Sequence, residues 1–217
     1  MAAINSNIPE KTIERLSEYR RTLLSCHKQG ITHIFSHVLA GMHGITAVQV
    51  RRDLMLIGFS SDTKKGYDVK VLIEFINNIL DSKSVMNVAI IGMGHLGQAI
   101  TKYFNSKGLK LRIVSAFDVD PEKVGKVIDD IPCYHMECFE EIVSTMDISI
   151  AVIASPTRVA NTLVLPIINA GIKGVLNFTS APLSFPQGIV SENFDITTIL
   201  EKIAYFVKEG DEGSDKS

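Results

Sequence analysis

The sequence predicts an α/β protein with a helical N-terminal domain and a C-terminal domain built on a doubly wound parallel sheet. Downstream of Asp81, short apolar runs alternate with amphipathic segments of helical period, whereas upstream the chain reads as short helices. Charge changes at the same point: residues 1–80 hold 10 Lys and Arg against 7 Asp and Glu, a net +3, and residues 81–217 hold 12 against 17, a net −5. We therefore expect a domain over 1–80, a linker over 81–86, a domain over 87–208 and a disordered polar tail over 209–217.

Composition favours an ordinary globular protein of a reducing compartment. Hydrophobic residues make up 46% and charged residues 21%, no apolar run approaches 18 residues, and the N-terminus lacks the pattern of a signal peptide. Three cysteines do not form an even-numbered disulfide framework, which favours the cytoplasm. Cys133, His135 and Cys138 have no fourth ligand at regular spacing. We expect neither a metal site nor a membrane partner.

The N-terminal domain is expected to contain three consecutive helices. The first begins at Pro9, ends at Gly30 and places on one face Ile13, Leu16, Leu23 and Leu24. Ser36 can cap a second short helix through Ala40. A turn over 42–44 then leads to Thr46, which can cap the third helix.

The third helix has one apolar face and one face suited to nucleic acid. Val50, Leu54 and Ile57 follow the i, i+4, i+7 spacing of a buried stripe. Helical geometry places on the opposite face Val48, Gln49, Arg52 and Met55, with Arg51 on its flank. Such a helix after a short glycine turn is typical of a helix-turn-helix, in which Arg reaches guanine or phosphate, Gln reaches adenine, and Val and Met contact thymine methyls.

A basic turn within residues 58–67 resembles the wing of a winged helix. The residues predicted to bind DNA are therefore Gln49, Arg51, Arg52, Lys64 and Lys65. The same pattern is also typical of a helical dimerisation or cap domain whose arginines are solvated. The N-terminal sequence alone leaves both interpretations open.

The C-terminal domain begins with a strand that leads into a glycine-rich turn. Strands are expected at 87–91, 111–117, 148–153, 174–177 and 189–192, with a weaker one at 132–134, and helices from Leu96, from about Met136 and from Thr157 to Ala170. The first strand is followed by G-x-G-x-x-G at Gly92, Gly94 and Gly97, and the second ends on Asp118, 21 residues after the last glycine. This spacing is typical of dinucleotide binding, with the pyrophosphate at the helix start and the acid on a ribose hydroxyl.

Ligands of doubly wound sheets bind where the strands end, so the ends of the other strands complete the candidate site. These are Ala154-Ser155 and Asn177. Val119 and Asp120 supply no arginine for a 2′-phosphate, which favours NAD(H) over NADP(H). We expect NADH and NAD+ as the ligands.

Six motifs occur in a characteristic order along the chain. They are I-P-E-x-T-x-x-R-L at Ile8–Leu16, Q-V-R-R-D-L at Gln49–Leu54, K-G-Y-D-V at Lys65–Val69, G-M-G-H-L-G at Gly92–Gly97, F-D-V-D-P-E-K-V-G at Phe117–Gly125 and G-I-K-G-V-L-N-F at Gly171–Phe178. With them the chain resembles the Rex family of redox-sensing transcriptional repressors from Ile8 to Phe206.

The resemblance implies a homodimer with an N-terminal winged helix and a C-terminal NAD(H)-binding Rossmann domain. The last helix, Asp195–Lys208, would swap onto the partner subunit. NADH would release operator DNA, and NAD+ would compete for the same site. The implied nucleotide-binding residues are Gly92, Met93, Gly94, His95, Leu96, Gly97, Tyr103, Asp118, Ala154, Ser155, Asn177 and Asp195. Arg21, Tyr103 and Asp195 look like the network that couples the two domains.

Two other classes of function stay open from the residues. An NAD-dependent dehydrogenase would need a proton donor beside the nicotinamide, and His95 and His135 are poor candidates because one lies in the phosphate turn and the other in a loop. A nucleotide-bound interaction module that has lost DNA binding is the third class, because Asp62-Thr-Lys-Lys-Gly66-Tyr67 replaces the glycine-rich wing of the Rex family. Met55-Leu-Ile-Gly58 also stands where that family usually has S-Y-F-G. We expect no catalytic residues.

Overall fold

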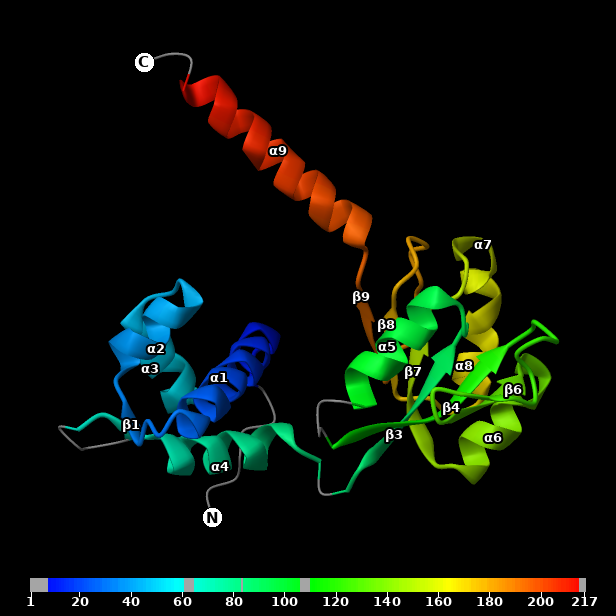
Figure 1. Ribbon diagram of the computed structural model, residues 1–217, viewed down its shortest axis with the longest axis horizontal. Helices are drawn as coiled ribbons and strands as arrows, with labels where there is room; N and C mark the ends of the chain where they lie inside the picture. Colours follow the sequence, from blue (N-terminus) through cyan, green and yellow to red (C-terminus); the bar gives the residue numbers. More distant parts are fainter. Residues whose placement is uncertain (1–7, 61–64, 83, 106–109, 215–217) are drawn as a thin grey trace. The chain divides into compact units, whose positions relative to one another are not determined.

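The computed structural model describes residues 8–60, 65–82, 84–105 and 110–214 (Figure 1). Contacts divide the chain into two compact units, Met1–Lys83 and Ser84–Ser217. Together they form a mixed α/β protein, as the sequence predicts.

The first unit is a winged helix. Its elements are α1 (Glu10–Lys28), β1 (His33–Ile34), α2 (Ser36–His43), α3 (Ala47–Leu56), β2 (Tyr67–Asp68) and α4 (Val69–Leu80). β1 and β2 pair antiparallel, with Ile34 opposite Tyr67, and so form the base of the wing. A strand of two residues is too short to show a hydrophobic period, so neither strand is predicted from the sequence.

The core of this unit joins α1, α3 and α4. Its fully buried side chains include Leu16, Leu23, Val50, Leu54, Leu72 and Ile76, and Ile57 is 5% exposed. The apolar stripe predicted for α3 is therefore confirmed. The prediction for Leu24 is wrong: it is 42% exposed, because a helix turns about 100° after Leu23 and carries the next side chain away from the core.

Two helix boundaries in this unit differ from the sequence prediction. α2 ends at His43 rather than Ala40, because Gly44 adopts a left-handed conformation with φ of 63° and terminates the helix there. Ser36 is the first residue of α2 rather than its cap, since Phe35 occupies the cap position. The cap of α3 is confirmed, because the Thr46 hydroxyl accepts a hydrogen bond from the Gln49 N–H at 3.1 Å.

The second unit contains a seven-stranded sheet with the strand order of a Rossmann fold. The strands are β3 (Met86–Ile91), β4 (Leu111–Asp118), β5 (Val127–Ile128), β6 (Ile131–His135), β7 (Ile148–Ile153), β8 (Gly174–Asn177) and β9 (Val190–Asn193). Their spatial order is β5-β6-β4-β3-β7-β8-β9, and all neighbours are parallel except the short hairpin of β5 and β6. The strand order reverses between β3 and β7, where a crevice for ligands is expected.

Both faces of the central part of this sheet are buried. Along β3, Val88 and Ile90 belong to one hydrophobic cluster, and Ala89 and Ile91 belong to another. Alternate side chains of a strand point to opposite faces, so each face has its own core. The strongly apolar strands found in the sequence follow from this double burial.

Helices follow most strands of this unit, and the last helix comes after the last strand. They are α5 (His95–Asn105), η1 (Met136–Cys138), α6 (Phe139–Thr145), α7 (Thr157–Ala160), η2 (Asn161–Leu163), α8 (Val164–Asn169) and α9 (Ile196–Ser214). The helix predicted over 157–170 is interrupted at η2, because Pro166 has no N–H with which to continue the hydrogen-bond ladder. α9 extends to Ser214, so the predicted disorder from Glu209 is wrong as far as that residue. Once a helix has formed, each added residue contributes one backbone hydrogen bond, so polar residues after the apolar part of α9 can continue the helix.

Candidate functional site

The turn between β3 and α5 owes its shape to two glycines that no other residue can replace without a clash. Gly92 has a φ of 99°, and a Cβ there would lie 2.7 Å from the Ala154 carbonyl oxygen. A Cβ at Gly97 would overlap the carbonyl oxygen of Gly92. Gly94 is different, because a Cβ there would meet nothing within 4 Å. The turn therefore packs tightly on its inner side and leaves the backbone at Gly94 open to a ligand.

The end of β7 lies directly beside this turn. The Ala154 N–H donates to the Ile91 carbonyl at 2.8 Å, and the Ser155 hydroxyl donates to the same oxygen at 3.0 Å. Ala154 and Ser155 are both half-buried. The structure thus brings the glycine turn and the Ala154-Ser155 strand end together at the point where the strand order reverses.

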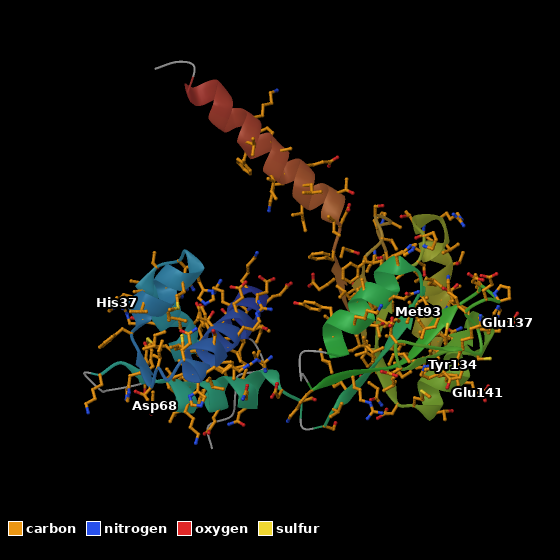
Figure 2. The ribbon with its side chains drawn as sticks, viewed as in Figure 1. His37, Asp68, Met93, Tyr134, Glu137 and Glu141 are labelled. Carbon is orange, nitrogen blue, oxygen red and sulfur yellow. The ribbon has the colours of Figure 1, made fainter. Side chains whose placement is uncertain are left out.

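Asp118 ends β4 and also contacts the glycine turn. Its Oδ2 accepts from the Met93 N–H at 2.8 Å and from Lys123 Nζ at 3.1 Å. Met93, which belongs to the glycine turn, is labelled in Figure 2. Asp118 Oδ1 accepts from the N–H groups of Val119 and Asp120 at 2.8 and 3.0 Å. Burial favours a higher pKa for the Asp118 carboxyl, but the hydrogen bonds and the Lys123 charge outweigh it and lower that pKa. Asp118 is therefore an anion at neutral pH.

The other residues predicted to bind nucleotide differ in how far they are buried. Met93 is fully buried, whereas His95 and Leu96 are exposed at the start of α5 and Tyr103 is 58% exposed further along that helix. Asn177 is buried, and its amide group is used inside the protein. It donates to the Ala181 carbonyl and to Asn193 Oδ1, both at 2.9 Å, and accepts from Thr179. Asn177 thus shapes the loop after β8 through its side chain.

Asp195 caps the last helix. Its Oδ1 accepts from the Thr197 N–H at 2.9 Å, and its Oδ2 accepts from the Thr198 hydroxyl at 2.9 Å. These hydrogen bonds lower the pKa of its carboxyl, led by the one from Thr198. Arg21 is exposed on α1 of the first unit, and Tyr103 and Asp195 belong to the second. Their predicted coupling stays a prediction.

The outward face of α3 combines arginines with exposed apolar side chains. Val48 is 64% exposed and Met55 is 73% exposed, and with Arg51, Arg52 and Leu56 they line a hollow of about 550 Å³. Arg51 Nη1 donates to the Ser36 hydroxyl at 3.0 Å, so α2 orients it. Lys65 is exposed beside β2, and Lys64 lies outside the described residues.

A buried charged network that the sequence patterns do not predict holds α3 against α1. Asp53 is fully buried on α3 and accepts from Arg15 Nε and Nη2, each at 2.7 Å. The Tyr19 hydroxyl donates to it at 2.8 Å, and Gln49 Nε2 donates to it at 2.9 Å. The burial of Asp53 could have been predicted from the sequence, because Asp53 lies between Val50 and Leu54 on the apolar stripe of α3. A buried carboxylate needs a hydrogen-bond or ionic partner.

This network also affects Gln49, one of the residues predicted to bind DNA. Burial favours a higher pKa for the Asp53 carboxyl, but its hydrogen bonds from Arg15, Tyr19 and Gln49 lower that pKa, so the group is an anion. A carboxylate only accepts hydrogen bonds, so the Gln49 amide must turn its nitrogen toward Asp53. Asp53 therefore restrains the amide that is predicted to face DNA.

Similarity to known proteins covers both units. The family model described as "Putative DNA-binding protein N-terminus" matches residues 7–54, and the "CoA binding domain" model matches residues 83–181. The redox-sensing transcriptional repressor Rex of Leuconostoc citreum is 36% identical over 200 residues, which cover 92% of this chain and 93% of that protein. The chain belongs to the Rex family. Rex of Listeria welshimeri is also 36% identical, with 94% of both chains covered.

Solved Rex-family structures share the fold of this chain. The crystal structure of the Rex-family repressor RSP has a TM-score of 0.86, with 28% identity over 97% of this chain and 99% of RSP. RSP in complex with NAD+ and operator DNA has a TM-score of 0.88, with 29% identity over 97% of both chains. A further structure holds RSP with NADH. The predictions of a Rex-family fold with a winged helix and a Rossmann-type sheet are thereby confirmed.

Across the described residues, no group of three or more His, Cys, Asp or Glu side chains is arranged to hold a metal ion. No helix in the same part of the chain is both long and apolar enough to cross a membrane. His135 Nδ1 accepts from the Glu137 N–H at 3.3 Å and so caps η1.

Proposed function

We propose that this chain is a redox-sensing repressor whose first unit binds operator DNA and whose second unit binds NADH or NAD+ at one site. NADH binding releases the DNA, and NAD+ competes with it. The observation that carries the proposal is the presence, in one Rex-family chain, of a basic recognition helix and a glycine turn open at Gly94. RSP, a relative of this chain, has been crystallised with NADH and with NAD+ and operator DNA.

The residues at the reversal of strand order fit a dinucleotide. The open backbone at Gly94 and the N–H groups at the start of α5 suit the pyrophosphate, because the first N–H groups of a helix have no partner within it. We assign the ligand to Gly92–Gly97, Ala154 and Ser155, with Asp118 toward the ribose of the adenosine. Asn177 and Tyr103 complete the assignment from family resemblance. When bound, the nicotinamide reports the redox state.

The domain assignment and the location follow from the same proposal. Residues 1–80 bind DNA, residues 87–208 bind nucleotide, and residues 81–86 link them. A repressor must reach chromosomal DNA, so we place the protein in the cytoplasm. We also propose that it is not an enzyme, because His135 already caps η1 and His95 lies in the phosphate turn. Steady oxidation of NADH with small carbonyl compounds would contradict that.

A gel shift with the DNA upstream of the chain's own gene tests the proposed function. The protein alone, or with NAD+, should retard the fragment, and NADH should release it. Coenzyme A is the matched control, because the domain model over residues 83–181 is described as CoA binding. Release by coenzyme A and not by NADH would reassign the ligand, and failure to retard any promoter fragment would favour an interaction module.

Removing charge from the wing should weaken binding to every DNA sequence. Replacing Lys64 and Lys65 by alanine should reduce the slope of log K against log salt by roughly 0.9 for each phosphate that the protein no longer neutralises. Lys11 is exposed at the start of α1, which is not part of the wing, and Lys11→Ala is the control. Filter binding at several salt concentrations measures the slope. An unchanged slope would remove the wing from the interface.

Arg52 is proposed to contact a base rather than the backbone. Arg52→Ala should cost about 1–3 kcal/mol on operator DNA and relax sequence choice at one position per half-site. Binding of the variant to operator and to random DNA is compared. Equal reductions in affinity for the two would make Arg52 a phosphate contact.

We also propose that the protein is a homodimer in which α9 packs against the partner subunit. Every residue of α9 from Ile196 to Lys208 is exposed. Ile196, Ile199, Leu200, Ile203, Phe206 and Val207 recur at helical spacing and so form one apolar face. An exposed face of this size needs a partner. Family resemblance makes that partner a second copy of this chain.

Leu200→Lys should break the dimer. Lysine on the apolar face would bury an unpaired charge, which we expect to cost about 2–4 kcal/mol of association free energy. Glu201→Lys introduces the same residue on the opposite face and is the matched control. Sedimentation equilibrium measures both. A Leu200→Lys protein as dimeric as the parent would contradict the assignment of α9 to the interface.

A further inference from the structure

The carboxylate of Asp118 has every acceptor position filled within the protein. Each oxygen accepts two hydrogen bonds: Oδ1 from the N–H groups of Val119 and Asp120, and Oδ2 from the Met93 N–H and Lys123 Nζ. An ionised carboxylate offers about four lone-pair positions. A ribose hydroxyl can therefore bind Asp118 only if one of the four donors moves.

Lys123 is the donor that can move. The other three are backbone N–H groups held by the end of β4 and by the glycine turn. The Lys123 ammonium is carried by a flexible side chain that is 28% exposed. It already has a second carboxylate partner, because Nζ lies 3.2 Å from Asp120 Oδ2. If the Lys123 ammonium moves away from Asp118, it loses one of its two ionic contacts, and the hydrogen bond that joins Asp118 to the glycine turn stays in place.

We propose that Lys123 is a specificity-determining residue of the adenosine-ribose pocket, occupying the Asp118 acceptor in the free protein and setting how strongly the pocket rejects a 2′-phosphate. This inference rests on the proposed NADH site and names a determinant within it. Asp118 without a cation would repel a phosphate at the ribose 2′ position. Lys123 neutralises that carboxylate and can itself donate to phosphate oxygens, since an ammonium binds phosphate as a point charge.

The charge on Lys123 is secure at neutral pH. Burial acts to lower the pKa of its ammonium group, but the hydrogen bonds and charges of Asp118 and Asp120 outweigh burial and raise that pKa. Lys123 therefore presents a full positive charge between two carboxylates. Positions 119 and 120 hold no arginine, which favours NAD(H) from the sequence, and among the described residues Lys123 is the cation that pairs with Asp118.

Lys123→Met should increase discrimination against NADPH. The side chain keeps its length and loses its charge, so NADH meets a free Asp118 acceptor and NADPH meets an uncompensated anion. We expect the ratio of the NADPH to the NADH dissociation constant to rise about tenfold, the effect of losing one charge-assisted hydrogen bond. Isothermal calorimetry with both nucleotides measures it. Lys123→Arg keeps the charge and should stay near the parent ratio.

Lys126→Met is the matched control, because Lys126 is exposed a few residues along the same loop. Its ratio should match that of the parent. If the ratio of the NADPH to the NADH dissociation constant is unchanged or smaller in Lys123→Met, the inference about Lys123 is wrong. The proposed nucleotide site still stands in that case, provided that the parent protein binds NADH. A parent that binds neither nucleotide would overturn both. Melting temperatures report folding, and Lys123→Gln repeats the test if the methionine variant is unstable.

Discussion

The Gly94→Val variant should fold as the parent does and lose its affinity for NADH. A Cβ at Gly94 meets nothing within 4 Å, and Gly94 is not among the glycines with positive φ, so neither packing nor backbone conformation forbids a side chain there. The valine would instead fill the space through which the pyrophosphate reaches the backbone. We expect affinity to fall by at least about a hundredfold, or ~2.7 kcal/mol, by calorimetry.

Gly97→Ala is the informative contrast to Gly94→Val. Its Cβ would overlap the Gly92 carbonyl oxygen, so α5 would have to move away from β3. This variant should lose thermal stability, whereas Gly94→Val should keep the parent melting temperature. NADH affinity unchanged by Gly94→Val would remove the glycine turn from the nucleotide site.

Asp195→Ala should abolish the effect of NADH on DNA binding if Asp195 couples the two activities. A ligand shifts an equilibrium between two forms only through different affinities for them, and coupling of this kind is typically about 5- to 150-fold. If Asp195 pairs with Arg21 in one form only, its removal should leave binding of NADH and DNA in place and abolish the influence of one on the other. DNA titrations with and without NADH measure this.

The cap made by Asp195 provides a second explanation that the experiment must separate. The carboxylate accepts from Thr197 and Thr198, so alanine also removes the cap of α9, at a cost of about 0.5–2 kcal/mol. Asp195→Asn keeps a good cap and removes the charge. Loss of the NADH response in a stable Asp195→Asn dimer would support coupling. A normal response in that dimer would show that Asp195 acts only as a cap.

Most of the candidate nucleotide site could be predicted from the sequence, because the motifs that indicate it lie within one short stretch of the chain. The apolar run of β3, the glycines at 92, 94 and 97 and the acid at the end of β4 lie within 32 residues, from Asn87 to Asp118. Gly92 and Gly97 have a steric reason in their immediate surroundings, because a Cβ at either position would clash with neighbouring backbone, whereas a Cβ at Gly94 would meet no protein atom within 4 Å. Strand and helix periods also need only one segment at a time, which is why β7 and β8 begin and end as predicted.

Contacts between distant segments were decided only by the tertiary structure. Arg15 and Asp53 are 38 residues apart and show no mutual spacing rule, yet they form the buried pair that holds α3 and restrains Gln49. β1 and β2 are each too short to have a period and exist because they pair with one another. The sequence predicts Asp118 as a ribose acceptor but not its other partners, the Met93 N–H and the Lys123 ammonium, which the fold brings to it. Sequence determines which segments become helices and strands, because hydrophobic period and backbone freedom are properties of short stretches. Only the fold determines which polar groups form hydrogen bonds with one another, because a buried polar group needs a partner and that partner can come from a distant part of the sequence.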